Sequence, residues 1–546
     1  MKHFSVFLLL ILTMQIAFSQ KDTTKQPSVT IVSAYKPVLI SPAKINFSAT
    51  QLPVDTFRNI KPYNIPSQNL HYAYQSITLN PLSIQNGNIQ LQPANGNYVK
   101  AGYGNLSSPY LDAALSFENK IPSTLINAYA NYYAAKGKII NQNFSSINIG
   151  SAASYFMPNS ECYGSIGLKK TDSYLYGYDK ELYTFDKSNI RHSFTTASLM
   201  LGYKNTAPNF LKINYNPTVG IDIFTLMDSV AEHNFKIILP ASYRINDKFS
   251  IALNGMIDLT KYSTKNTLVK HTISNNIFQI TPELGFRNKR FALKVATAFA
   301  NNNKQSLLLP NIYAEVPLKS NQLSVYAGWN SSLIKNNYQF LTSINPYLLV
   351  VDSQINTQKN EYYAGLKTSI GKFITINANA SFNKYEHFQF FMNDTTDLAR
   401  SHYFVLYQED KLNHFKLHGD ITYTIRDHFS FSGGITFNAY SGNKKNEKLW
   451  NTLPMEANAS LRWNPKSKLL IKGDMYLFSA TSFIEKGNLT KSTKGGTDLS
   501  IGAEYKFNKH IGAFVDLNNI FGESYERWHQ YPVYGLNMHG GVIVRF

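Results

Sequence analysis

The chain has 546 residues, of which 75 are aromatic (35 Phe, 36 Tyr and 4 Trp), and only 16% of its residues are charged. Soluble globular proteins carry about 25% charged residues, so this composition argues against that class. The apolar content of 43% is ordinary and excludes a protein made mainly of membrane-spanning helices. A formal net charge of +19 would fit nucleic-acid binding, but the N-terminal export signal argues against such a partner.

Residues 1–19 have the pattern of a signal peptide. Lys2 precedes a mostly apolar run over residues 4–14, and residues 17–19 (Ala-Phe-Ser) include the small side chains that signal peptidase recognises. We therefore predict cleavage before Gln20. The alternative is an N-terminal membrane anchor, which needs about 20 apolar residues, more than this run provides.

Residues 20–95 differ from the rest of the chain. They hold eight of its 21 prolines and show little sustained alternation of polar and apolar residues. Proline removes backbone donors from a β-ladder. We therefore predict an extended N-terminal segment or a reduced plug. The eight prolines are Pro27, Pro37, Pro42, Pro53, Pro62, Pro66, Pro81 and Pro93.

From about residue 96 to the C-terminus, apolar and polar residues alternate along the chain, as in strands that have one apolar face. A soluble β-sandwich would alternate in the same way, but strand length, aromatic content and the connections favour a barrel. No stretch of 18 apolar residues occurs here, so a closed barrel is the structure that could satisfy every backbone group in lipid. In the last strand, Leu536, Met538, Gly540, Val542, Val544 and Phe546 alternate with Asn537, His539, Gly541, Ile543 and Arg545.

The connections between these segments are alternately short and long, as in outer-membrane barrels with periplasmic turns and external loops. Short polar turns are predicted at 246–248, 288–289, 319–320, 371–372, 426–427, 465–467 and 508–509, and upstream near 119–122, 157–160 and 205–208. Long stretches are predicted at 263–274, 333–358, 386–401, 441–452, 482–494 and 519–534.

The strand count follows from the short turns, because each interval between them holds two strands. Seven intervals from Asp247 onward give 14 strands and four upstream intervals give eight, which makes 22. Residues 96–546 are therefore predicted to form an all-β, transmembrane antiparallel β-barrel of about 22 strands, with 20 or 24 also open. The predicted turns carry Lys248, Lys289, Arg290, Lys319, Lys372, Arg426, Lys466, Lys468 and Lys509, which can reach lipid phosphates or simply keep the turn tips soluble.

The C-terminal region resembles that of TonB-dependent receptors. Residues 514–521 (FVDLNNIF) are followed by Tyr525, Trp528, residues 531–532 (Tyr-Pro) and Gly535, and the last strand ends in phenylalanine. Resemblance to this family implies a 22-strand barrel in the outer membrane of a diderm bacterium. It also implies recognition by the barrel-assembly machinery, through a C-terminal signal formed by Val542, Val544 and Phe546.

Upstream, residues 29–46 and 98–105 (YVKAGYGN) resemble a group of receptor-like barrels found in Bacteroidota. The sequence also departs from the receptor pattern. Leu536 follows Gly535 where arginine is common, and no convincing energy-coupling box lies near Gln20. Only the 76 residues 20–95 lie between the predicted cleavage site and the first strand. The family's plug domain is considerably longer than that, so we expect a full-length plug to be missing.

The sequence carries no motif of the common catalytic and metal-binding classes. The sequence contains no zinc-helix pattern, EF-hand loop, phosphate-binding loop or Gly-x-Ser-x-Gly elbow, and Cys162 is its only thiol. His414 and His418 would lie about 13 Å apart along a strand, too far for one metal ion without help. We therefore predict no catalytic residue, cofactor or metal site, and no enzyme activity. Charged pairs that would keep a lumen hydrated and neutral are Lys472 with Asp474 and Glu504 with Lys506.

One predicted external loop, 386–401, carries bulky side chains at His387, Phe388, Phe390 and Phe391. They could form a partner contact or fold inward and close the pore. Two functions remain open: substrate uptake across the outer membrane, or a non-transporting structural or assembly role for other outer-membrane or surface proteins. The expected partners are outer-membrane lipid, lipopolysaccharide, the barrel-assembly machinery, and a TonB-type energy coupler or other outer-membrane proteins.

Overall fold

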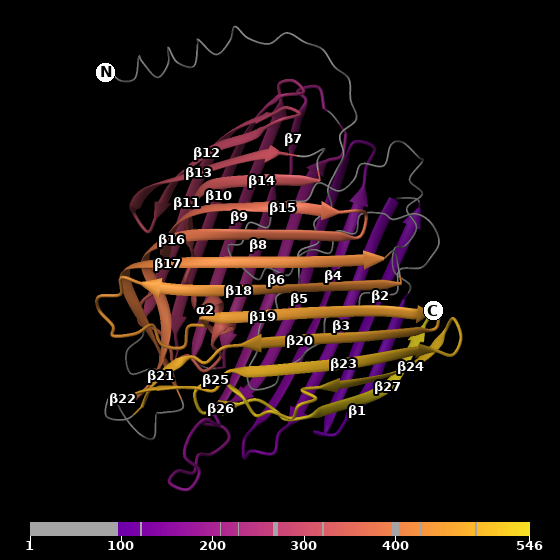
Figure 1. Ribbon diagram of the computed structural model, residues 1–546, viewed down its shortest axis with the longest axis vertical. Helices are drawn as coiled ribbons and strands as arrows, with labels where there is room; N and C mark the ends of the chain where they lie inside the picture. The colour runs from indigo at the N-terminus through magenta and orange to yellow at the C-terminus, as the bar shows by residue number, and fades with distance from the viewer. Residues whose placement is uncertain are drawn as a thin grey trace.

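The computed structural model describes residues 97–546, except for 121–122, 208, 228, 266–270, 319–321, 396–402, 426–427 and 486–488. The predicted signal peptide and the segment 20–95 lie outside the described residues. The described chain is nearly all β-strand (Figure 1). Within it, no helix is both long and apolar enough to cross a bilayer.

Successive antiparallel strands pair around one closed sheet. The first half contains β1 (Tyr98–Gly104), β2 (Ser108–Lys120), β3 (Ser123–Lys136), β4 (Asn143–Phe156), β5 (Ser160–Tyr174), β6 (Arg191–Asn205), β7 (Ile213–Tyr215), β8 (Thr218–Leu226), β9 (Val230–Arg244), β10 (Phe249–Thr264), β11 (Thr272–Arg287) and β12 (Ala292–Asn302). The second half contains β13 (Gln305–Pro317), β14 (Leu323–Ile334), β15 (Thr357–Ile370), β16 (Ile374–Asn393), β17 (Phe404–Ile425), β18 (Phe429–Ser441), β19 (Met455–Lys466), β20 (Leu469–Phe478), β23 (Gly496–Lys506), β24 (Ile511–Asn518) and β27 (Asn537–Arg545).

The sheet closes because the first and last strands pair. β1 lies between β2 and β27, and its register with β27 runs from Tyr98 opposite Arg545 to Gly104 opposite His539. The sheet has 23 strand segments, but β7 and β8 both pair with β9 and form one strand interrupted at residues 216–217, so the barrel has 23 − 1 = 22 strands. The predicted count of 22 is confirmed.

Three of the short connections share one local cause. Asn246, Asn288 and Asn508 each accept hydrogen bonds at the side-chain oxygen from the backbone N–H groups two and three residues later, at 2.7–2.9 Å. This Asx-turn geometry reverses the chain in a few residues. We call the end of the barrel that holds these turns the turn end, and the opposite end the loop end.

Outside the main sheet, the long connections carry three small elements. These are helix α2 (Tyr338–Ile344), the hairpin β21 (Ser482–Glu485) with β22 (Leu489–Ser492), and the hairpin β25 (Glu526–Trp528) with β26 (Tyr531–Pro532). All three belong to connections at the loop end.

The predicted alternation of faces is confirmed in the last strand. Met538, Val542 and Val544 are exposed on the outside, whereas His539 and Ile543 are buried on the inside. Elsewhere the outward apolar residues run from Phe249 to Leu259 on β10 and from Phe415 to Tyr423 on β17. Spans of 9–11 residues match the length that a tilted strand needs to cross a bilayer.

The walls of the barrel differ in height at the loop end. β16 and β17 have 20 and 22 residues, whereas β1, β24 and β27 have 7, 8 and 9. The stretch 386–393 therefore does not belong to a loop, as the sequence suggested, but to the extended end of β16. The neighbouring residues Phe390 and Phe391 are both buried there, and a strand buried on both faces does not alternate.

Candidate functional site: a loop-built cap

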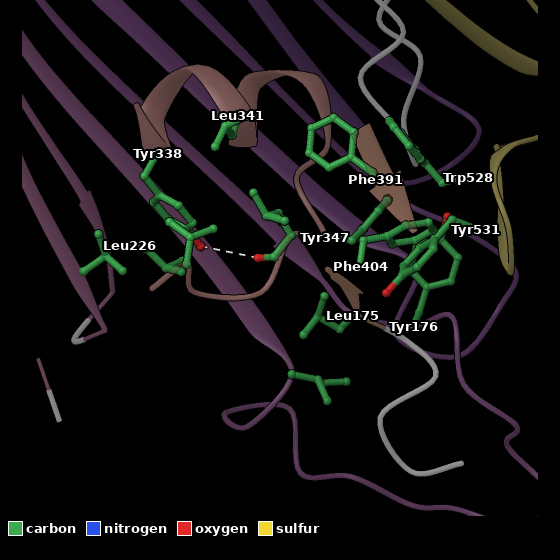
Figure 2. Packing of buried hydrophobic residues seen from close by; sticks show 14 of the residues in the cluster. Leu175, Tyr176, Leu226, Tyr338, Leu341, Tyr347, Phe391, Phe404, Trp528 and Tyr531 are labelled. Carbon is green, nitrogen blue, oxygen red and sulfur yellow. Dashed lines mark hydrogen bonds between the residues drawn. The ribbon is translucent and has the colours of Figure 1, made fainter. Parts of the chain in front are cut away.

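Connections at the loop end fold toward one another and form an apolar cluster, which we call the cap (Figure 2). Its members come from loops 175–190, 335–356 and 519–536 and from the ends of β8, β9, β10, β16 and β17. These elements lie at several places around the ring of strands, so the cluster spans the mouth. The cap consists of Leu175, Tyr176, Tyr178, Ile190, Phe224, Leu226, Val230, Tyr262, Tyr338, Leu341, Tyr347, Leu348, Val351, Phe391, Phe404, Trp528 and Tyr531.

Two rings from the last loop lie at the centre of the cap. Tyr531 is fully buried, and its ring stacks on that of Tyr347 and meets the edge of Tyr176, 5.0 Å between centroids. Trp528 is 1% exposed and meets Phe391 and Phe404 edge-on at 5.5 and 5.3 Å. Figure 2 shows these rings converging from different segments. Buried aromatic pairs of this kind contribute about 0.5–1.5 kcal/mol each beyond the area they bury.

Hydrogen bonds fix the position of the last loop. The carbonyl oxygen of Pro532 accepts hydrogen bonds from the side-chain amide of Gln142 at 2.8 Å and from the Tyr176 hydroxyl at 2.7 Å. The Arg527 guanidinium donates to the carbonyl of Asn451 at 3.1 Å. The last loop is thus tied to three other connections, and it acts as a strap across the mouth.

Loop 335–356 is attached to the wall through a buried carboxylate. Glu232 on β9 accepts hydrogen bonds from the backbone N–H groups of Tyr338 and Gln339, at 2.8 and 3.1 Å, and from the side-chain amides of Asn337 and Gln354. A negative charge is favourable beside the free N–H groups that begin a helix. The Glu232 carboxylate therefore fixes the start of α2 and, through Gln354, the last part of loop 335–356.

Burial changes the ionisation of the tyrosines in the cap. The phenol groups of Tyr176, Tyr338 and Tyr531 lie in loops and have their pKa values raised well above 10, chiefly because burial disfavours the phenolate. The cap therefore favours neutral tyrosine hydroxyls. The cap is thus an apolar cluster supported by hydrogen bonds.

A second cluster lies on the inner face where the barrel closes. Lys100 on β1 is 1% exposed and pairs with Glu504 on β23 at 3.3 Å and with Asp516 on β24 at 3.1 Å. Lys472 on β20 pairs with the same two carboxylates, and Arg545 on β27 lies 3.6 Å from Glu504. We call these five residues the seam network, because they connect the first strand to four of the last strands.

The phenylalanine side chains of the predicted partner-contact loop lie close together, and they pack against other side chains of the protein. Phe391 belongs to the cap, and Phe390 is buried against Leu412, Leu449 and Trp450 in a neighbouring cluster. Phe388 packs against that same cluster.

His387 adopts a left-handed backbone conformation with φ of 57°. Of the two open interpretations of this stretch, the inward packing of Phe390 and Phe391 favours closure of the mouth.

Val542, Val544 and Phe546 face outward at the turn end of β27, and their role as an assembly signal stays a prediction. His414 and His418 bond to Asn438 and Thr436 respectively. Among the described residues, no group of three or more His, Cys, Asp or Glu side chains could hold a metal ion.

The charged pairs suggested by the sequence are rearranged. Asp474 pairs with Arg462 on the neighbouring strand at 3.1 Å, and Glu504 pairs across strands in the seam network. Cross-strand neighbours stand closer than residues two apart on one strand, so these partners depend on strand order.

No family model matches the sequence, and no curated protein matches it. Solved structures do share its fold. The FrpB iron transporter from Neisseria meningitidis has a TM-score of 0.65 at 10% identity, over 83% of this chain and 81% of that one. The siderophore receptor PirA from Acinetobacter baumannii has a TM-score of 0.62 at 11% identity, over 83% and 80%. The pyoverdine outer-membrane receptor FpvA from Pseudomonas aeruginosa PAO1 has a TM-score of 0.62 at 11% identity, over 83% and 79%. At such identities the likeness establishes the barrel fold.

Proposed function

We propose that this protein is an outer-membrane barrel of a diderm bacterium that takes up a substrate across that membrane, with the cap as the closed state of its entrance. The observation that supports this most directly is a 22-strand closed barrel whose mouth is filled by its own loops. Barrels of 16–18 strands already leave an aqueous channel. A barrel that passed no solute would not need 22 strands, so the strand number supports a role in passage.

The fold is shared with proteins described as an iron transporter and as siderophore receptors, which supports uptake as the general activity. We further propose that residues 20–95 serve as a reduced plug and that export follows removal of residues 1–19. Val542, Val544 and Phe546 would be recognised by the assembly machinery.

The discriminating experiment is crosslinking in living cells between residues 20–95 and the TonB-type energy coupler. A photoreactive residue placed at successive positions of this segment should yield a crosslinked product that depends on the coupler gene. A control position in an external loop, Glu181, should yield none. If no position crosslinks although the barrel is present in the outer-membrane fraction, energy-coupled uptake is wrong.

The alternative is a structural or assembly component for other outer-membrane or surface proteins. A mouth filled by packed loops would also suit a barrel that conducts nothing, so the cap alone does not separate the two functions. Co-purification of a constant set of outer-membrane proteins, together with an absence of coupler crosslinks, would support this alternative.

A further inference from the structure

Two glycines face each other on the inner wall of the barrel. Gly150 on β4 lies opposite Gly167 on β5. A Cβ atom added to Gly150 would stand 2.6 Å from the hydroxyl oxygen of Tyr129 on β3, and one added to Gly167 would stand 3.0 Å from Oγ of Ser198 on β6. The two strands lack side chains at this level, so hydroxyl groups from both neighbouring strands lie close to the backbone there.

A lysine and an aspartate accompany this glycine pair. Lys169 is two residues after Gly167, and Leu168 between them is 41% exposed on the outer face. Because successive side chains of a strand alternate between faces, Lys169 points into the lumen. Asp222 on β8 lies opposite Ser198 and shares its face, since directly opposed residues of paired strands stand on the same side of the sheet.

Strand register arranges these residues in two adjacent rows on the inner wall. The row nearer the turn end consists of Tyr129, Gly150, Gly167, Ser198 and Asp222. The row nearer the loop end consists of Asn131, Asn148, Lys169, Thr196 and Phe224. We give the name polar shelf to the polar residues around the glycine pair, which are Tyr129, Asn148, Lys169, Thr196, Ser198 and Asp222.

The polar shelf adjoins the cap. Phe224, which pairs with Thr196, is itself a member of the cap and stacks on Phe194 at 5.9 Å between centroids. Glu232 follows Phe224 in the same row and holds the start of α2. A solute that passed the opened mouth on this side would therefore meet the polar shelf directly below the cap.

The two charges of the polar shelf lie outside the salt bridges of the wall. Lys169 is exposed, and among the described residues it takes part in no salt bridge or side-chain hydrogen bond. Asp222 is half-buried and also forms none within the described part of the chain. The cation that acts on it, Lys236, is paired with Asp258 at 3.5 Å. An ammonium and a carboxylate on one lumen surface are thus left for a solute.

The separation of the two charges defines what they could hold. Lys169 and Asp222 are two strands apart and offset by two residues, which places their Cα atoms about 12 Å from each other. The hydroxyl groups of Thr196 and Ser198, each able to donate and to accept a hydrogen bond, lie between them. A complementary solute carries a carboxylate and an ammonium several ångströms apart, with amide groups between the two.

We propose that the polar shelf binds a zwitterionic solute of the short-peptide class, with its carboxylate at Lys169 and its ammonium at Asp222. The side chains of Asn148, Thr196 and Ser198 would hydrogen-bond the amide groups between these ends. Hydrogen bonds to charged groups are the stronger ones, so the two charged ends would supply most of the discrimination. The inference rests on the proposed function and deepens it, because it names a substrate class for the same passage.

The test measures the binding of three peptides to the purified full chain by calorimetric titration. The chain carries Trp528→Ala so that solutes can pass the cap. Tri-alanine should bind about tenfold more tightly than N-acetyl-tri-alanine, which lacks the ammonium, or tri-alanine amide, which lacks the carboxylate. Lys169→Met should abolish the discrimination against the amide, and Asp222→Asn the discrimination against the acetylated peptide. Lys170→Met, at the adjacent position on the outer face, is the matched control and should keep both.

Equal binding of the three peptides, or no binding of tri-alanine, would overturn the proposal. A preference for either capped peptide would overturn it as well, because such a site would recognise a single charge.

Thiol protection provides a second measurement, with Tyr531→Ala as the opening substitution should Trp528→Ala prevent folding. Ser198→Cys in a Cys162→Ser background should react with a small thiol reagent, and tri-alanine should slow this reaction at least about fivefold. Lys170→Cys should show no slowing. An unslowed reaction, or a cysteine that the reagent never reaches, would refute binding at the polar shelf. A failure of coupler crosslinking would leave both measurements unchanged, so the substrate class and energy-coupled uptake fail separately.

Discussion

The cap depends on a few aromatic side chains of the last loop. Trp528 and Tyr531 touch rings from loops 175–190 and 335–356 and from β16 and β17. Each buries a large apolar surface against side chains of several segments. Two residues of the last loop therefore provide many of the contacts between the segments that form the cap.

Substitution of Trp528 by alanine should open the cap. Loss of a buried tryptophan costs about 3–5 kcal/mol, so loop 519–536 should detach and become a protease target. The measurement is the rate of proteolytic cleavage within loops 335–356 and 519–536 on intact cells. Phe521→Ala is the control, because Phe521 belongs to the same loop and is 56% exposed. Equal rates in the two variants would contradict a central role for Trp528.

The buried phenols predict loosening of the cap in alkali. Tyr531 and Tyr176 keep raised pKa values in the closed cap, whereas an opened loop would ionise near pH 10. Stability from these groups is fully present below pH 10 and falls as the pH rises above it, because only the open form releases its protons. Loop cleavage should increase above pH 10, and Tyr531→Phe should reduce the increase. A flat profile up to pH 11 would argue against this account.

At the scale of single residues, the sequence predicts which strand side chains face outward and which face inward. It does not predict which residues form the cap. Alternation is a local property with a period of two, so Val542 and His539 could be assigned to opposite faces. The contact between Tyr176 and Pro532 joins residues 356 apart, and nothing near either residue announces it. The stretch with Phe390 and Phe391 was mistaken for a loop because both of its faces are buried.

At the scale of elements, strand length and turn chemistry determine where the barrel begins and ends. The asparagine-led turns specify hairpins locally, and for that reason the count of 22 could be obtained from the sequence. Helix α2 could not, since it has only seven residues and its start depends on Glu232 from a strand about a hundred residues earlier. The seam network likewise depends on the meeting of distant strands.

Substitution of Lys100 by methionine should weaken the closure between β1 and the last strands. Breaking a buried ion pair leaves uncompensated charge and costs about 3–5 kcal/mol, although Lys472 still faces both carboxylates and would reduce this cost. The temperature at which the folded band disappears in gel electrophoresis should fall. Lys289→Met, at an exposed turn, should leave it unchanged. An equal melting temperature for both variants would show that backbone pairing alone closes the barrel.

For the whole molecule, the central question is how a lumen of this width stays closed to solutes. In the part of the chain that the structure describes, the cap at the loop end is built from side chains of three loops and five strands, and we interpret it as a barrier. The proposed plug would supply a second barrier at the turn end. Two barriers in series would allow one to open while the other holds.

Deletion of residues 21–95 should therefore increase the entry of a large antibiotic that the outer membrane normally excludes. Combination of the deletion with Trp528→Ala should increase entry further than either change alone, since it removes both barriers. Growth inhibition at graded antibiotic concentrations gives the measurement, with Phe521→Ala combined with the deletion as control. Unchanged entry after the deletion would mean that the loops alone seal the pore.

The pairing of β1 with β27 also constrains the time course of biogenesis. Tyr98 pairs with Arg545, near the end of the chain, so the cylinder stays incomplete until nearly the whole polypeptide is present. Until then the growing sheet has two open edges that can pair with any other extended chain. Contacts of such long range also form slowly. We therefore expect the unpaired strands to need shielding between synthesis and insertion.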